Sequence, residues 1–242
     1  FVASGALQEK IISPGKLIND PGYILIKNQY DPSIVYTFSG VKPHGLVDMR
    51  KALAVSSNIY FYTIGGGNAT GTNIFHGLGV KKMRDYFRAF GLGSTLGIDL
   101  PQESSGRVPD PAWKERVKKE KWLLGDTYNL SIGQGDISLT PLQLVSAVSS
   151  IANGGTLYRP HVGLRLRDNN KNVVKEFDPE VLRSNFITED NLKLVREGMK
   201  EAVEYGTASL LSGMSGEVAA KTGTAQFGGM LRTWFTGFAP FD

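Results

Sequence analysis

The sequence predicts a mixed α/β fold of the α+β type, in which a helix-rich lobe is joined to part of an antiparallel sheet. Three observations indicate this fold. Stretches with apolar residues at helical spacing fill the middle of the chain, strand-like runs gather toward its C-terminal end, and no internal repeat is visible. A chain of 242 residues can bury a sizeable core, so we expect one domain or two lobes of one.

Helices are predicted where apolar periodicity coincides with start or stop signals. The first spans residues 45–58, and the second spans residues 80–93 with Gly91 as a left-handed C-terminal stop. The third, residues 139–155, has a threonine at the N-cap and a proline at the first helical position. The fourth, residues 188–206, repeats the threonine cap and adds acidic residues in its first turn.

Strand character is clearest in runs of alternating bulk near the C-terminus. These runs lie at residues 161–167, 173–177, 217–225 and 232–239. We therefore expect residues 17–215 to form a mostly helical lobe and residues 216–242 to supply sheet strands. The chain opens within a helical pattern, with no cap ahead of Phe1, and stops as a strand leaves the sheet. Residues 1–242 are thus expected to be a partial domain of a longer protein.

Composition excludes several classes of function. The net charge is +4, but the lysines are scattered, and the run at 114–121 mixes both signs as a solvated helix face does rather than a nucleic-acid patch. Absence of cysteine excludes disulfides, thiolate catalysis and cysteine-ligated zinc. The histidines, His44, His76 and His161, lack metal-type spacing, and no apolar run is long enough to span a bilayer.

The stretch "AAKTGTAQ" would place several useful groups at one strand edge. Lys221 is a cation that can attract a carboxylate, and the hydroxyls of Thr222 and Thr224 can donate to the same group. Gly223 removes a side chain and so lets a ligand approach the backbone. Four such residues occur together by chance in many sequences, so the motif alone is a weak signal.

A second motif, "SSN", follows the helix predicted at 45–58 and places Ser56 and Asn58 in a Ser-x-Asn arrangement. Its ordinary interpretation is a helix C-cap with the asparagine in the left-handed conformation. However, Ser-x-Asn followed by Lys-Thr-Gly is the order found in active-serine enzymes that recognise β-lactams. The two motifs together therefore favour a functional site.

Further stretches resemble one family over nearly the whole chain. They are "ALAVSSNIYFY", "FGLGSTLGIDLPQESSGRVP", "SIGQGDISLTPLQLVSAVSSIANGG", "GMKEAV" with "GTA", "AAKTGTAQ" and "WFTGFAP". The chain resembles the transpeptidase domain of a class B penicillin-binding protein, of the elongation type known as penicillin-binding protein 2. The resemblance implies the penicillin-binding protein/serine β-lactamase-like transpeptidase fold.

The family's first motif, Ser-x-x-Lys, supplies the nucleophilic serine and its base. The literal match "SPGK", from Ser13 to Lys16, is rejected because Pro14 and Gly15 favour a turn, whereas the motif must open a helix. In the family, the motif lies a few residues before a stretch similar to "FVASGAL". The resemblance therefore places the nucleophile and its lysine upstream of Phe1, so this chain alone is expected to be inactive.

The resemblance also assigns roles to the two remaining motifs. Ser56 would relay protons between the nucleophile's lysine, Lys221 and the leaving amine. Asn58 would hold the substrate's side amide and orient the base. Thr222 and Thr224 would bind the terminal carboxylate, beside Gly223. The backbone N–H of Thr224 would also form half of an oxyanion hole. Gln226 would line the cleft.

The implied activity is D,D-transpeptidation of peptidoglycan stem peptides through an acyl-serine intermediate, which β-lactams would intercept. No metal or organic cofactor is implied, and no nucleic acid. The implied location is the periplasmic, extracytoplasmic face of the membrane, with cell-wall synthesis proteins as partners and an anchor outside this chain. Two alternatives stay open: a serine β-lactamase, and a non-catalytic sensor or scaffold domain of the same fold.

Overall fold

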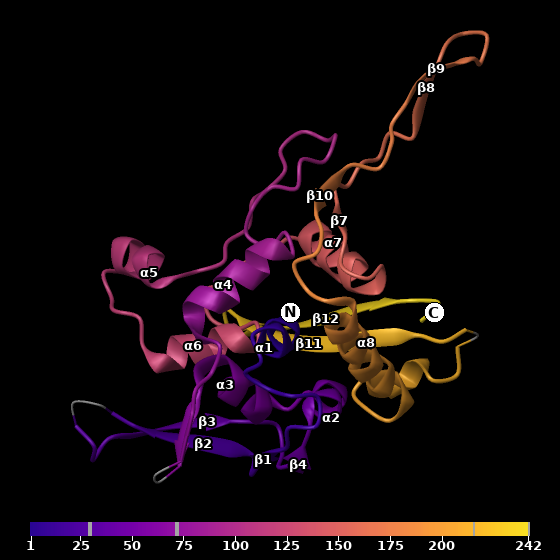
Figure 1. Ribbon diagram of the computed structural model, residues 1–242. Helices are drawn as coiled ribbons and strands as arrows, with labels where there is room; N and C mark the ends of the chain where they lie inside the picture. The colour runs from indigo at the N-terminus through magenta and orange to yellow at the C-terminus, as the bar shows by residue number, and fades with distance from the viewer. Residues whose placement is uncertain (29–30, 71–72, 215, 242) are drawn as a thin grey trace.

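The computed structural model describes residues 1–28, 31–70, 73–214 and 216–241, except for the side chains at 69, 70, 73, 226 and 227 (Figure 1). The helices are α1 (Val2–Gln8), α2 (Met49–Val55), α3 (Asn58–Gly66), α4 (Gly79–Ala89), α5 (Pro111–Lys118), α6 (Leu124–Ser131), α7 (Pro141–Ala152) and α8 (Glu189–Glu204), with a 3₁₀ turn at Ser209–Leu211. None of the described helices is both long and apolar enough to cross a membrane.

The described strands pair into antiparallel ribbons of two strands each. The pairs are β1 (Ile18–Asp20) with β4 (Gly45–Val47), β2 (Tyr23–Lys27) with β3 (Val35–Ser39), β5 (Asn68–Thr70) with β6 (Asn73–Phe75), β7 (Leu157–Tyr158) with β10 (Val181–Arg183), β8 (Arg165–Arg167) with β9 (Val173–Glu176), and β11 (Ala219–Phe227) with β12 (Met230–Phe238). The expected mixture of helices and antiparallel sheet is therefore confirmed.

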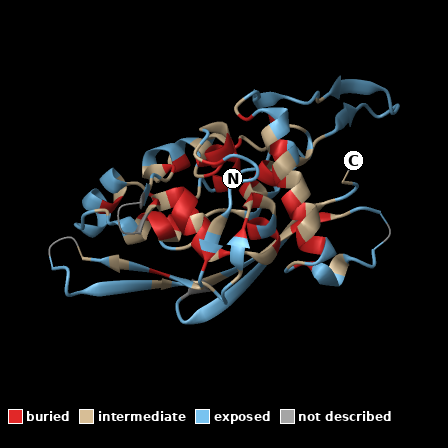
Figure 2. Ribbon diagram, turned by 60° about the horizontal axis from the view of Figure 1, so that its bottom comes forward, coloured by how far each residue is buried: buried red, intermediate tan, exposed pale blue. Residues whose placement is uncertain are grey.

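Buried residues, red in Figure 2, lie mostly on the helices, and strand β11 of the C-terminal hairpin adds Ala219 to the main core. The main core joins buried residues of α1, α2, α3, α4, α7 and α8, including the fully buried Tyr60, Met83 and Leu192. Helix α8 packs against both α2 and β11 (Figure 1). This packing brings the end of α2 next to the C-terminal hairpin.

The helix predictions with clear caps agree with the structure. Helix α7 has the expected N-cap, Thr140, which accepts from the N–H of Gln143; the Gln143 side chain accepts in return and completes a capping box. Helix α4 ends just before Gly91, which has the expected positive φ of 83°. Helix α8 begins after Thr188, but that side chain makes no capping hydrogen bond.

The predicted helix at residues 45–58 begins too early, whereas its expected end at the Ser-Ser-Asn stretch agrees with the structure to within three residues. Residues 45–47 form strand β4, and Asp48 caps α2 by accepting from the N–H of Lys51 at 2.9 Å. The helix then stops at Val55, and a new helix, α3, begins at Asn58 with Ser57 as its cap. The cap at Asp48 thus separates strand β4 from helix α2, which periodicity alone joined.

The lobe expected at 17–215 contains more strands than "mostly helical" implies, because ribbons β1 to β10 all lie within it. The run at 114–121 also differs from expectation. Part of it forms α5, and Lys114 is only 6% exposed because its ammonium group pairs with Asp126 at 2.8 Å. The other residues of the run are exposed, as a solvated face should be.

Candidate active site

The two predicted motifs meet in space. The ammonium group of Lys221, on β11, donates to the Ser56 hydroxyl at 2.6 Å and to the carbonyl oxygen of Thr222 at 2.7 Å. Lys221 and Ser56 lie 165 positions apart in the chain. The tertiary fold therefore brings the serine of Ser-x-Asn to the lysine of Lys-Thr-Gly.

Ser56 has an unusual backbone conformation that aims its side chain at Lys221. Its φ of 59° and ψ of 45° lie in the left-handed region, which costs a residue with a side chain roughly 1–2 kcal/mol. If the motif were only a helix C-cap, Asn58 would be expected in that left-handed conformation. Asn58 is instead the first residue of α3. Strain at a single serine between two helices is typical of a functional site.

A buried carboxylate holds the turn that follows Ser56. Asp20, at the end of β1, is 1% exposed and accepts from the Ser57 hydroxyl at 2.5 Å and from the N–H of Gly22 at 2.8 Å. Ser57 in turn accepts from the N–H of Tyr60 at 3.1 Å. The N-terminal ribbon thus anchors the cap of α3 and, with it, the start of the Ser-x-Asn motif.

The end of α2 is also tied to the segment after α8. The N–H of Thr207 donates to the carbonyl oxygen of Ala54 at 3.0 Å. A Cβ atom on Gly206 would lie 2.2 Å from the same oxygen, so this approach requires glycine. The Thr207 hydroxyl accepts from the Thr222 hydroxyl at 2.7 Å. One segment therefore fixes both the turn at Ser56 and the motif strand.

Burial gives Lys221 an amine suited to proton transfer. Desolvation lowers the pKa of Lys221 from 10.5 to about 8, since a partly buried ammonium loses hydration. An amine with a pKa near 8 exchanges protons readily at neutral pH. When Lys221 is neutral, its nitrogen can accept the proton of Ser56, so the pair can carry a proton in either direction.

One edge of β11 faces away from its partner strand β12. The carbonyl oxygen of Thr222 accepts from Lys221, and that of Thr224 accepts from the side-chain amide of Gln134 at 2.8 Å. Within a strand, the N–H and C=O groups of one residue point to the same side. The N–H groups of Thr222 and Thr224 therefore point to this edge as well, where β11 has no neighbouring strand among the described residues.

The remaining predicted residues are placed as follows. Gly223 is exposed, and a Cβ atom there would meet only Trp234 at 3.6 Å, so nothing within the described structure requires a glycine. The side chains of Asn58 and Thr224 make no hydrogen bond to the described residues, which leaves them available to a ligand. Gln226 lies on β11 opposite Leu231, but its side chain is outside the described part.

Sequence reasoning missed three residues that shape this site. Asp20 carried no motif signal, whereas Gln134 and Thr207 stood in stretches quoted for their family resemblance without a role being assigned to either. Each acts on a residue distant in sequence, so periodicity and spacing could not find it.

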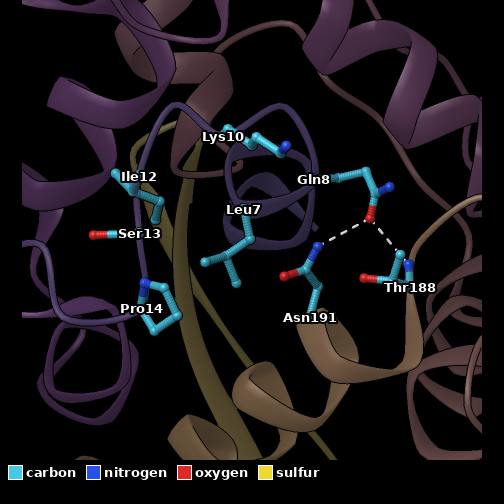
Figure 3. Close-up of a pocket in the computed structure, with 8 residues that line it drawn as sticks. All are labelled: Leu7, Gln8, Lys10, Ile12, Ser13, Pro14, Thr188 and Asn191. Atoms are coloured by element: carbon cyan, nitrogen blue, oxygen red, sulfur yellow. Dashed lines mark hydrogen bonds between the residues drawn. The ribbon is translucent and has the colours of Figure 1, made fainter.

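The rejected match "SPGK" lies in a turn, where the N–H of Lys16 donates to the carbonyl oxygen of Ser13 at 3.0 Å. Figure 3 shows Ser13 beside a pocket of about 470 Å³ between the segment after α1 and the start of α8. In that pocket, Gln8 accepts from Thr188 and Asn191. Neither Ser56 nor Lys221 lines it, so this pocket is separate from the motif pair.

The arrangement of Ser56, Lys221 and the open strand edge is typical of active-serine enzymes that recognise β-lactams. The family model for the penicillin-binding protein transpeptidase domain matches residues 1–242. The chain belongs to this family.

The chain is also similar to individual proteins of this family. The chain is 35% identical over 226 residues to the peptidoglycan D,D-transpeptidase MrdA of Acinetobacter baumannii, covering 93% of this chain and 31% of that protein. It is similar to the structure of penicillin-binding protein PBP2 from Helicobacter pylori, with a TM-score of 0.80 and 30% identity, covering 99% of this chain and 41% of that one. PBP2 from Pseudomonas aeruginosa gives a TM-score of 0.82 at 27% identity, covering 99% and 51%. The chain thus spans about a third of the length of its curated relatives.

Proposed function

We propose that this chain is part of a peptidoglycan D,D-transpeptidase domain, which cross-links stem peptides through an acyl-serine intermediate and is acylated by penicillin. The observation that carries the proposal is the 2.6 Å contact between the Lys221 ammonium and the Ser56 hydroxyl. This contact joins the second and third motifs of the active-serine enzymes in the order found there. Family membership and the similarity to proteins named D,D-transpeptidases support it.

In this proposal, the nucleophilic serine and its lysine come from residues that precede Phe1. The serine attacks the carbonyl carbon between two D-alanines, forming an acyl-serine and releasing D-alanine. Ser56 and Lys221 carry the proton from the nucleophile to the departing amine, for which a pKa of about 8 at Lys221 is well matched. An amine of a second stem peptide then takes the acyl group and restores the serine.

The free edge of β11 binds the substrate in this proposal. The N–H of Thr224 points to that edge and donates to the developing oxyanion, an interaction typically worth about 3–4 kcal/mol. The hydroxyls of Thr222 and Thr224, with the charge of Lys221, bind the terminal carboxylate. Asn58 holds a substrate amide, exposed Gly223 leaves room for the ligand, and Gln226 lines the same edge.

Partners and location follow from the same proposal. One solved neighbour is a complex between PBP2 and MreC from Helicobacter pylori, and another concerns a peptidoglycan synthase complex. We infer that this protein also works with cell-wall synthesis proteins, on the periplasmic side of the membrane. Its anchor would lie in a segment other than the one described here.

The test is covalent labelling with a fluorescent penicillin of the protein extended to include the residues before Phe1. A stable adduct on a serine upstream of Phe1 is expected. Lys221→Met should reduce the labelling rate by about 10²-fold or more, because proton transfer through Ser56 is lost. Lys175→Met, which removes an exposed lysine of β9, is the control and should label normally.

Three other outcomes would contradict the proposal in different ways. Absence of labelling would overturn it. Rapid release of hydrolysed penicillin would indicate a β-lactamase instead. An adduct on Ser13 would show that "SPGK", and not an upstream motif, carries the nucleophile.

A further inference from the structure

The loop between α6 and α7 reaches across to the free edge of β11. At its tip, the side-chain amide nitrogen of Gln134 donates to the carbonyl oxygen of Thr224 at 2.8 Å. Gly133 and Gly135 flank this residue with φ values of 75° and 81°. A Cβ atom on Gly133 would meet nothing within 4 Å, so the glycines serve the turn itself rather than close packing. The tight turn presents Gln134 to the strand.

Both sides of this turn are held in place. On the α6 side, the N–H of Gln134 donates to the carbonyl oxygen of Asn129 at 2.8 Å. On the other side, the carbonyl oxygen of Asp136 accepts from the Arg107 guanidinium at 2.9 Å, and the Asp136 carboxylate pairs with Lys118 at 2.6 Å. Gln134 is therefore a donor on an anchored loop, and its position relative to β11 is set by other elements.

The carbonyl oxygens of Thr222 and Thr224, at the free edge, both accept from side-chain donors: Thr222 from Lys221 and Thr224 from Gln134. A bare carbonyl oxygen beside a developing oxyanion would repel it, whereas a carbonyl that accepts a hydrogen bond presents less negative potential. At these two residues the edge therefore offers N–H donors to a ligand, while their carbonyl oxygens are already hydrogen-bonded.

We propose that Gln134 is a positioning residue of the acyl-transfer site: by binding the carbonyl oxygen of Thr224, it holds β11 so that the N–H of Thr224 faces the reacting oxygen. This inference rests on the proposed function. Gln134 acts through Thr224 and touches no reacting atom. Its effect falls on the transition state, where the oxyanion forms, more than on the initial binding of the ligand.

The experiment measures penicillin acylation of the protein that includes the residues before Phe1, separating non-covalent affinity from the acylation rate constant. Gln134→Met removes the donor at similar length and should lower the rate constant about 10-fold, while the dissociation constant changes less than about 3-fold. Gln134→Glu should lower the rate constant further, because its carboxylate adds negative charge beside the oxyanion. Melting temperatures of both variants, compared with the wild type, show whether the fold is retained.

Gln102→Glu is the matched control, because Gln102 is an exposed glutamine in another loop, away from the Gln134–Thr224 contact. This variant should acylate at the wild-type rate. Wild-type rate constants in both folded Gln134 variants would overturn the role of Gln134 while leaving the proposed function intact. Equal losses in affinity and rate constant would also overturn it, since they indicate a general disturbance of the site. Failure of the wild type to acylate would overturn the proposed function, and this inference with it.

Discussion

Two regions of the molecule differ in how they are held together. One is the junction where α2, α8 and β11 meet, and the other is the ribbon formed by β8 and β9. At the junction, Ala54, Ala202 and Ala220 are all 0% exposed, and small side chains let the backbones approach closely. On the ribbon, which projects from the rest of the molecule in Figure 1, Leu166 is 54% and Val174 is 67% exposed. The junction is built from tertiary contacts, whereas the ribbon is built from the pairing of its own two strands.

The attachment of the ribbon shows the same contrast. Asp99 accepts from the N–H groups of Val162 and Gly163 at 2.7 and 2.8 Å, at the base of the ribbon. These contacts use backbone donors, so they do not depend on a functional side chain at Val162 or Gly163. At the junction, by contrast, side-chain identity matters. Gly206 is required because a Cβ atom there would collide with the backbone of Ala54, and Ser56 is required because its hydroxyl binds Lys221. A site that transfers protons needs the second kind of construction, because small displacements of its groups cost large factors in rate.

The largest stability effect is expected where the junction is tightest. Gly206→Ala places a Cβ atom 2.2 Å from the carbonyl oxygen of Ala54, and neither backbone can move without separating α2 from α8. We expect a loss of about 3 kcal/mol in the free energy of unfolding, measured by urea titration. Gly213→Ala is the control, since nothing lies within 4 Å of a Cβ atom there. Equal stability of the two variants would show that the junction is more tolerant than its geometry indicates.

A smaller effect should appear in the pH dependence of stability. Because the pKa of Lys221 is lowered to about 8 in the folded protein, the unfolded chain binds more protons between pH 8 and 10.5. The free energy of unfolding should therefore rise with pH through this window. Below the window, the folded protein carries the full free-energy cost of burying the charged amine. Between pH 7.5 and 9.5, the wild type should gain about 2 kcal/mol relative to Lys221→Met, measured by urea unfolding at both values.

The comparison between variants matters here because other groups titrate at high pH. Burial raises the pKa values of Tyr60 and Tyr128, for example, and those shifts oppose the rise by favouring the neutral folded form. They are shared by the wild type and Lys221→Met, so they cancel in the difference. A difference that stays constant between pH 7.5 and 9.5 would mean that Lys221 is solvated in the folded protein.

The smallest effect is expected on the ribbon. Leu166→Ala removes a side chain that is more than half exposed, so the free energy of unfolding should change by less than about 0.5 kcal/mol. Thermal unfolding is the measurement, with Leu192→Ala as a contrast, because Leu192 is 0% exposed in the main core. A large destabilisation by Leu166→Ala would show that the ribbon is covered in solution.

Local signals in the sequence predicted the local structure well. The N-cap Thr140 and the proline that follows it located α7, and Gly91 marked the end of α4. The strand runs of the C-terminal hairpin were also found, because alternation of side chains is a short-range pattern. At Asp48, however, periodicity alone joined strand β4 to helix α2, which the structure separates.

The sequence by itself determined which residue types are available and in what order along the chain: a serine and an asparagine after a helix, and a lysine, a glycine and two threonines on a strand. Only the tertiary structure decided that Lys221 meets Ser56, that Asp20 holds the turn after Ser56, and that Gln134 reaches the free edge of β11. The physical reason is range. Caps and alternation act between near neighbours, whereas these contacts join residues 37, 90 and 165 positions apart, which only the packing of the whole core brings together.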